Sequence, residues 1–314
     1  MRAPLVLSLL LAAAMAGCAA PALVPNPSRL APWTTALRDA QPEGPRAAVY
    51  RYRGRPFVFV GASHSTDTEG PTFRLIRQAY DAFDFDTAIV EGVAYASGPN
   101  PPRLLAYVAG SAAEGTFQPG GETVPAVEGA QGEGAAVWGG EPSDRDVLAL
   151  ATGSGVSEAD VLGFYVLRSV PQWLSEREID SPGDPRTAQL VDSALAEERA
   201  ALGLAPDVLP DYASWAAWYE RTNGRPFGDG FQTEEVGPLA DGPHGTNRVG
   251  YAISRARDSF LLERVADHLS RGEAVIVVYG GSHLPILRPA LDAMLGPACY
   301  VGDDLSEAGA RCRD

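Results

Sequence analysis

Residues 274–283 read AVIVVYGGSH, and this stretch decides the fold. Six consecutive apolar residues, rich in β-branched side chains, predict a buried strand that the following glycines end. A strand buried on both faces belongs to a sheet covered by helices on both sides, which indicates an α/β fold. Residues 56–64, PFVFVGASH, repeat the pattern: an apolar run, a glycine, and an imidazole three residues later.

The sequence around the second stretch predicts the first part of the sheet. Residues 47–53 and 56–60 are apolar runs separated by a Gly-Arg pair, which predicts a β-hairpin. Apolar residues at helical spacing over 72–83 predict a helix, and residues 87–90 predict a short buried strand that ends at Glu91. The order strand, helix, strand indicates a parallel pair joined by a right-handed crossover.

The middle of the chain predicts an insertion. Residues 96–137 are rich in Gly, Pro and Ala and predict a long loop with one short helix. Helical patterns follow, at about 143–178, 186–202 and 212–221. We therefore expect a single α/β domain over 47–314, with a mixed sheet whose parallel core strands are flanked by helices, and a largely helical insertion at about 96–250. Beyond it, we expect a helix at 251–271, the strand at 274–279, a closing helix at 285–295 and a last strand at 298–301.

The N-terminus has the pattern of an export signal. Arg2, the apolar run 5–15 and the small residues before Cys18 predict a signal peptide over 1–17, too short to span a bilayer as a mature helix. The sequence Met-Ala-Gly-Cys ending at Cys18 resembles the lipobox of bacterial lipoproteins, which implies that this cysteine becomes the lipid-modified first residue. An ordinary cleaved signal peptide is the alternative. In both cases we expect an exported protein, with residues 18–46 as a flexible tether; the lipobox implies an anchor in the cell envelope.

The net charge of the chain limits the classes of partner that it can bind, and its cysteines predict a disulfide bond. The chain has 25 basic residues, all of them Arg, and 40 acidic residues, for a net charge of −15. This balance excludes nucleic acid or an anionic lipid surface as the general binding partner. Cys299 and Cys312 form an even pair in an exported chain, which predicts a disulfide bond.

Three of the predicted strands end in polar side chains that suit a metal site. His64, Glu91 and His283 each follow an apolar run, so parallel neighbouring strands would bring them together at the carboxyl edge of the sheet. Two imidazoles and a carboxylate are a common ligand set for Zn²⁺, Mn²⁺ or a similar ion. On the helix over 251–271, Asp258 falls on the apolar face and therefore needs a partner. The other two histidines, His244 and His268, are predicted to be surface residues.

Five short motifs resemble the TraB/TIKI superfamily, which includes erythromycin-esterase-like and ChaN-like proteins. The resemblance lies in the order and spacing of motifs over about 56–295, with a divergent middle. The motifs are GASH at His64, VEG at Glu91, GGEP at Glu141, the pair Arg257-Asp258, and VVYGGSHL at His283.

The resemblance implies roles for five of these residues. His64, Glu91 and His283 would be ligands of a divalent ion (Zn, Mn or Co) or catalytic groups. Glu141 would be a catalytic base or a further ligand, and Arg257 would stabilise charge on a substrate oxyanion.

Three functions follow as alternatives. The first is an exported, lipid-anchored, metal-dependent hydrolase of peptide or ester bonds, since TIKI proteins are metal-dependent proteases and the esterase branch opens a cyclic ester. The second is a lipoprotein that binds haem or another ligand, as ChaN-like members do. The third is a pseudo-enzyme that serves as an interaction module. The partners that we expect for the chain are the membrane, through the anchor at Cys18, and a peptide or small-molecule substrate.

Overall fold

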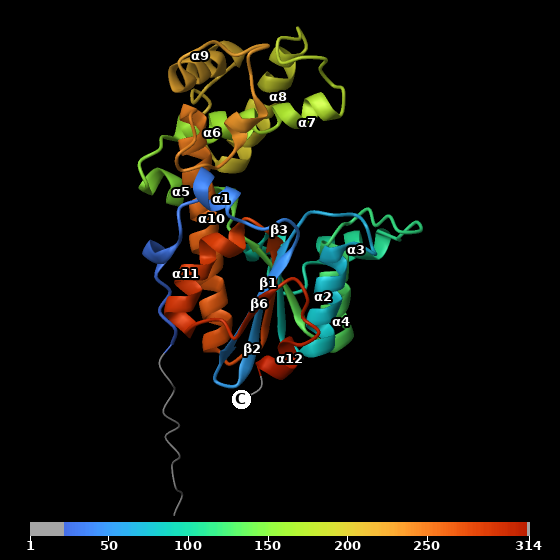
Figure 1. The fold of residues 1–314 in the computed structure, drawn as a ribbon. Helices are drawn as coiled ribbons and strands as arrows, with labels where there is room; N and C mark the ends of the chain where they lie inside the picture. The colour runs from blue at the N-terminus through green and yellow to red at the C-terminus, as the bar shows by residue number, and fades with distance from the viewer. Residues whose placement is uncertain (1–21, 313–314) are drawn as a thin grey trace, which may run out of the picture.

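A computed structural model describes residues 22–312, and it is built on one six-stranded sheet with helices on both faces (Figure 1). The strand order is β4-β3-β5-β2-β1-β6. The four strands β4, β3, β5 and β2 are parallel, whereas β1 is antiparallel to both β2 and β6. The predicted mixed sheet with a parallel core is therefore confirmed. The strands are β1 Arg46–Tyr52, β2 Arg55–Ala62, β3 Thr87–Ala94, β4 Ala136–Glu141, β5 Val275–Gly280 and β6 Tyr300–Gly302.

The hairpin predicted at the start of the domain is present. β1 and β2 pair from Arg46 opposite Gly61 to Tyr52 opposite Arg55. The two residues between the strands, Arg53 and Gly54, have φ of 52° and 77°. Two consecutive positive φ values match the tight turn whose twist suits a two-residue hairpin.

The strand β5 lies in the middle of the sheet and contributes side chains to two apolar cores, one on each face of the sheet. Its side chains alternate, so Ile276 and Val278 pack on one face while Val275 and Val277 pack on the other. One face is covered by α2 Pro71–Ala82, α3 Pro102–Gly110, α4 Thr123–Glu133 and α12 Ala308–Arg311. The other face is covered by α10 Gly245–Ser270 and α11 His283–Leu295. This double covering is the reason that the strand reads as an unbroken apolar run.

The predicted direct pairing of the strands before and after α2 needs a correction. β2 and β3 are parallel, but β5 lies between them and bonds to both. The long segment after β4 thus returns the chain to the middle of the sheet. As a result, the carboxyl ends of β2, β5 and β3 are immediate neighbours.

The prediction for 96–137 is correct for its one short helix, which is α3, but wrong for the long loop around it. This segment holds η2 Tyr95–Ser97, α3 and α4, and it ends in the edge strand β4. The helix α4 contains Pro125 and two glycines, which lower intrinsic helix propensity, and packing of its apolar side against the sheet stabilises it instead. In β4, Gly140 must lack a side chain because a Cβ there would lie 2.5 Å from the ring of Tyr279. The glycines that the packing requires thus removed the strand signal from the sequence.

The helical insertion is present, but it begins only after β4. It forms a separate lobe above the sheet in Figure 1, with its own apolar core that includes Trp215, Trp218 and Tyr219. The first half of α10 belongs to this lobe, and the second half runs down across the sheet. The lobe contains α5 Asp144–Gly153, α6 Glu158–Leu167, α7 Val170–Ser175, α8 Thr187–Leu202, α9 Tyr212–Asn223 and η3 Thr233–Val236.

The predicted flexible tether over 18–46 is also corrected where the structure describes it. Residues 22–45 contain η1 Pro27–Arg29 and α1 Thr35–Asp39 and lie against the domain. Leu30 and Trp33 are buried in the core beside α11, and the amide of Ala31 donates to the carbonyl of Ile286 at 2.9 Å. Two large apolar side chains that find a core position outweigh the Pro and Ala composition that suggested a linker.

The predicted disulfide bond near the C-terminus is confirmed, whereas the predicted signal peptide stays a prediction. Cys299 and Cys312 form the predicted disulfide and join β6 to α12. Among residues 22–312, no helix is both long enough and apolar enough to cross a bilayer. The signal peptide over 1–17 and the lipidation site Cys18 lie outside the described residues.

Candidate active site

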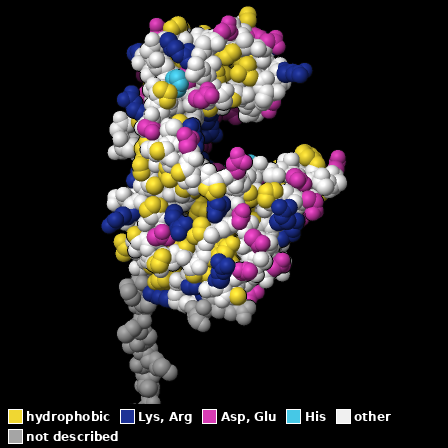
Figure 2. All heavy atoms as spheres, in the orientation of Figure 1, with side chains coloured by type: hydrophobic (Ala, Val, Ile, Leu, Met, Phe, Trp, Pro, Cys, Tyr) yellow, Lys and Arg dark blue, Asp and Glu magenta, His cyan; other side chains and the backbone are white. Residues whose placement is uncertain are grey.

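A pocket of about 430 Å³ lies at the carboxyl edge of the sheet, where the helical lobe faces it. Figure 2 shows a deep hollow between the same two parts of the molecule. The sheet supplies the ends of β2, β3 and β5, with His64, Glu91 and His283. The lobe supplies a wall that includes Phe164 and Arg168. The three residues predicted to converge therefore line one pocket.

The buried imidazole of His283 is held by a carboxylate from α10. Its Nδ1 lies 2.5 Å from Oδ1 of Asp258, and both side chains are almost completely buried. Asp258 thus has the partner that its position on an apolar helix face required. When Nδ1 carries a proton and donates it to this carboxylate, the other ring nitrogen is free to carry a lone pair. That nitrogen, Nε2, lies 3.7 Å from Oε1 of Glu91.

The exposed imidazole of His64 is held in the same way from another element. Its Nδ1 lies 2.5 Å from Oε1 of Glu122, which precedes α4, and its side chain is 71% exposed. This hydrogen bond raises the pKa of His64, and it outweighs partial burial, which acts in the opposite direction. Burial alone would raise the pKa of Glu122, but hydrogen bonds from His64 and other donors lower it. The raised pKa of His64 and the lowered pKa of Glu122 are what a charge-assisted hydrogen bond between the two side chains produces.

Glu91 lies between the two imidazoles, at an irregularity in β3. The pairing of β3 with β5 ends at Val90, and the register with β4 shifts directly after it. Oε2 of Glu91 accepts a hydrogen bond of 2.6 Å from the amide of Gly280. A Cβ on Gly280 would lie 3.2 Å from this same Oε2 and 3.2 Å from Nε2 of His64. Gly280 thus leaves a space that both side chains face.

The other predicted pair, Glu141 and Arg257, forms a half-buried cluster beside the pocket. Nε of Arg257 donates to Oε2 of Glu141 at 2.7 Å, and its Nη2 donates to Oε1 of Glu91 at 2.9 Å. Glu141 also accepts a hydrogen bond of 2.7 Å from the hydroxyl of Tyr279. Burial would raise the pKa of Glu141, but the bonds from Arg257 and Tyr279 lower it; burial raises the pKa of Tyr279 well above its ordinary value.

The positions of Glu141 and Arg257 relative to the pocket differ. Arg257 lines the pocket that holds His64 and His283, whereas Glu141 lines only a neighbouring hollow. Within the described part of the chain, no partner is recorded for Nη1 of Arg257. One side of the guanidinium is therefore fixed by Glu141, and one nitrogen remains able to donate to a bound molecule.

Sequence reasoning did not identify Glu122 or Tyr279 as site residues. Glu122 lies in a Gly-rich stretch without periodicity, and Tyr279 looks like the last residue of an apolar strand, so neither had a signal of its own. The prediction of His268 as a surface residue is wrong: its side chain is fully buried and lies 2.6 Å from Glu273. His244 is half-buried and caps the start of α10.

Among residues 22–312, no group of three or more His, Cys, Asp or Glu side chains is arranged so that it could hold a metal ion. The three predicted ligands are near one another, but their present contacts are with Glu122, Gly280, Arg257 and Asp258. The arrangement therefore consists of two carboxylate-backed imidazoles on either side of a third carboxylate.

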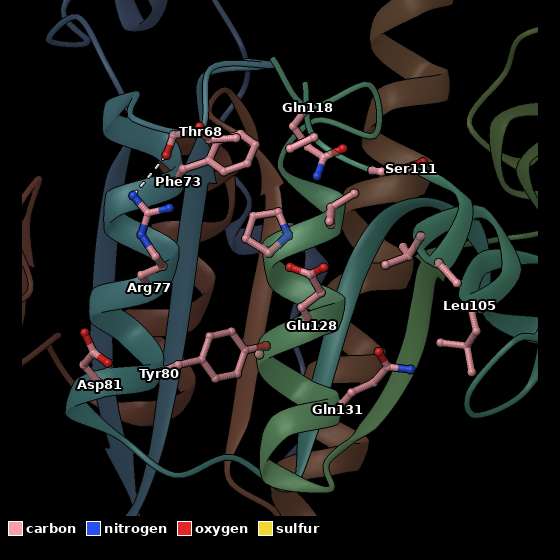
Figure 3. Close-up of a pocket in the computed structure, with 17 residues that line it drawn as sticks. Thr68, Phe73, Arg77, Tyr80, Asp81, Leu105, Ser111, Gln118, Glu128 and Gln131 are labelled. Atoms are coloured by element: carbon pink, nitrogen blue, oxygen red, sulfur yellow. Dashed lines mark hydrogen bonds between the residues drawn. The ribbon is translucent and has the colours of Figure 1, made fainter. Parts of the chain in front are cut away.

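A larger pocket, of about 620 Å³, lies away from these residues between α2, α3 and α4 (Figure 3). Phe73 and Tyr80 of α2 face Glu128 of α4 across it, and Arg77 donates to the carbonyl of Thr68 at 3.0 Å. It contains none of the residues that the motifs identified. The pocket at the sheet edge is the better candidate because it joins a cavity to converging titratable groups.

Comparison of the chain with protein-family models, with curated proteins and with solved structures found no match.

Proposed function

We propose that the chain is a metal-dependent hydrolase of peptide or ester bonds, with His64, Glu91 and His283 as its metal ligands. One observation carries the proposal: each imidazole is held at Nδ1 by a buried or half-buried carboxylate, at 2.5 Å, beside the carboxylate of Glu91. Histidines that bind metal are commonly oriented in this way, because the outer carboxylate fixes the ring and increases the basicity of Nε2.

The donor set fits a divalent ion such as Zn²⁺, Mn²⁺ or Co²⁺. Two imidazole nitrogens and a carboxylate oxygen leave a position open for water, and both oxygens of Glu91 retain a lone pair beyond their present bonds. When bound, such an ion lowers the pKa of a water ligand and polarises a carbonyl group. The three donor side chains line one pocket, into which such an ion would bind.

The chain's own residues have separate tasks in this proposal. Arg257 offers Nη1 to a developing oxyanion, as the family resemblance implies. Glu141 holds Arg257 in place and is a poor base, because its pKa is lowered and its oxygens already accept bonds from Arg257 and Tyr279. The lobe residue Phe164 gives the pocket an apolar wall opposite the sheet.

The location is part of the same proposal. We infer an exported protein that is anchored in the cell envelope through Cys18. The disulfide between Cys299 and Cys312 supports export, since such bonds persist in oxidising compartments.

The test combines metal binding with activity. The purified protein is stripped with a chelator, reloaded with Zn²⁺, Mn²⁺ or Co²⁺, and assayed for bound metal and for hydrolysis of peptide and ester panels. We expect one ion per chain and hydrolysis that depends on it, both lost in His64→Ala and His283→Ala. His244→Asn, which keeps a good helix-capping residue, is the control and should retain both. Metal-independent hydrolysis, or a haem spectrum without bound metal, would overturn the proposal.

A further inference from the structure

A third pocket, of about 370 Å³, lies on the other side of the strand ends, between the segment 37–46 and α11. In Figure 1, α1 lies beside α11, and residues from both elements line the pocket. Its walls are mostly apolar and include Leu37, Pro42, Leu284 and Pro289. The pocket has the size of a small-molecule site, and it exists because the N-terminal segment packs on the domain instead of hanging free.

Two arginines supply the charge in this pocket. Arg46 is on β1, and side-chain alternation places it with Ala48 and Tyr50 on the face covered by α11. Within the described residues, the side chain of Arg46 has no recorded hydrogen bond or ion pair. Arg288 of α11 contacts Asp292 only through Nε, at 3.3 Å from each carboxylate oxygen. Donors on both guanidinium groups therefore remain available.

No acidic side chain lines the pocket. Asp292 is already engaged by Arg288 and by the hydroxyl of Tyr50, at 2.8 Å. In a chain with a net charge of −15, an apolar cavity that contains two arginines and no carboxylate is a local exception. Charge complementarity therefore selects an anion, and the apolar walls select one with a hydrocarbon part.

The strand residue Gly61 gives the pocket its depth. Gly61 pairs with Arg46 and its α-carbon faces α11, where an added Cβ would lie 3.2 Å from Cβ of Leu284. Any larger side chain would fill the pocket. Gly281 is the one residue that lines both this pocket and the candidate active site, so the two cavities share no side chain.

We propose that this pocket binds a single-chain aliphatic carboxylate. The carboxylate lies between Arg46 and Arg288, where a planar guanidinium can donate two parallel hydrogen bonds. The hydrocarbon chain packs on Leu37, Leu284 and Pro289. This site is independent of the proposed hydrolase, since it shares no titratable side chain with it.

Calorimetric titration of the purified protein with decanoate, decanol and acetate tests the proposal. We expect decanoate to bind at one site, decanol to bind at least tenfold more weakly, and acetate not to bind. Arg46→Gln breaks no recorded side-chain contact and should weaken decanoate at least fivefold without changing decanol. Leu37→Ala should weaken both, because it removes a wall of the pocket. Arg38→Gln, on the exposed side of the same helix, is the control.

Two results would overturn the proposal. One is equal affinity for decanoate in the protein and in Arg46→Gln, with both folded by circular dichroism. The other is binding to vesicles that contain phosphatidylglycerol together with no binding of decanoate, which would indicate a lipid surface as the partner.

Discussion

Asp258 Oδ1 and His283 Nδ1 lie 2.5 Å apart, in a pair that is almost completely buried. Asp258 directly follows Arg257 on α10, so one turn of helix presents a carboxylate to an imidazole and a guanidinium to Glu91. A single long helix thus fixes two groups at the end of the sheet. This explains how both residues of the Arg-Asp motif come to lie at the site.

Replacing Asp258 with Asn should weaken metal binding. The amide keeps the size of the side chain but removes the charge that supports the Nδ1 proton of His283. We expect the affinity for Zn²⁺ or Mn²⁺ to fall by about 10- to 100-fold, the usual effect of losing such an outer carboxylate. Competition with a chromogenic chelator measures it. Asp267→Asn, at an exposed position on the same helix, should leave the affinity unchanged; equal affinities in the two variants would contradict the assigned role.

Glu122→Gln should lower the pKa of His64. The hydrogen bond from Glu122 raises this pKa in the folded protein. Such a group stabilises the fold fully below its unfolded pKa, about 6.5, and the contribution is lost as pH rises through the raised value. Titration of the four imidazoles by NMR in metal-free protein should show the shift.

The same variant has a stability signature. The difference in unfolding free energy between the protein and Glu122→Gln should be larger at pH 5.5 than at pH 8.5, as measured by urea denaturation. Glu128→Gln, on the adjacent α4, is the control and should leave the titration of His64 as it is. A pKa for His64 that does not respond to Glu122→Gln would show that the pair does not form in solution.

Arg257→Lys should destabilise the protein although it keeps the charge. Lysine cannot donate to Glu141 from two nitrogens and also reach Glu91, so part of a half-buried ion-pair cluster is left unpaired. We expect a loss of about 2 kcal/mol in the free energy of unfolding. Arg248→Lys, exposed on the same helix, should change it by less than about 0.5 kcal/mol. An equal loss of unfolding free energy in Arg257→Lys and Arg248→Lys would contradict a stabilising role for the contacts of Arg257 with Glu141 and Glu91.

The sequence predicted the sheet edge well because the signal there was local. A buried central strand must be apolar at every position, so β2 and β5 could be recognised from the sequence. The histidines that follow these strands line one pocket at the sheet edge. His64, Glu91 and His283 converge because their strands are parallel neighbours, which is the condition on which the prediction rested.

The missed parts depend on contacts between distant segments. Glu122 reaches His64 across 58 residues, from a stretch with no periodicity. The strand β4 lost its signal to glycines that the ring of Tyr279 requires. The Gly-rich composition of these segments predicted loops, because the contacts that determine their structure are with residues far away in the sequence.

The N-terminal segment gives the clearest test of packing against composition. Trp33 is only 9% exposed and lies in the core beside α11, and its carbonyl accepts a hydrogen bond of 2.8 Å from Ala240. Trp33→Ala should therefore reduce the free energy of unfolding by about 3 kcal/mol, as for other buried aromatic residues. Val24→Ala, at a position that is 82% exposed, should have almost no effect. Urea denaturation of the two variants separates the alternatives: if residues 22–45 were a free tether, neither substitution would change the midpoint.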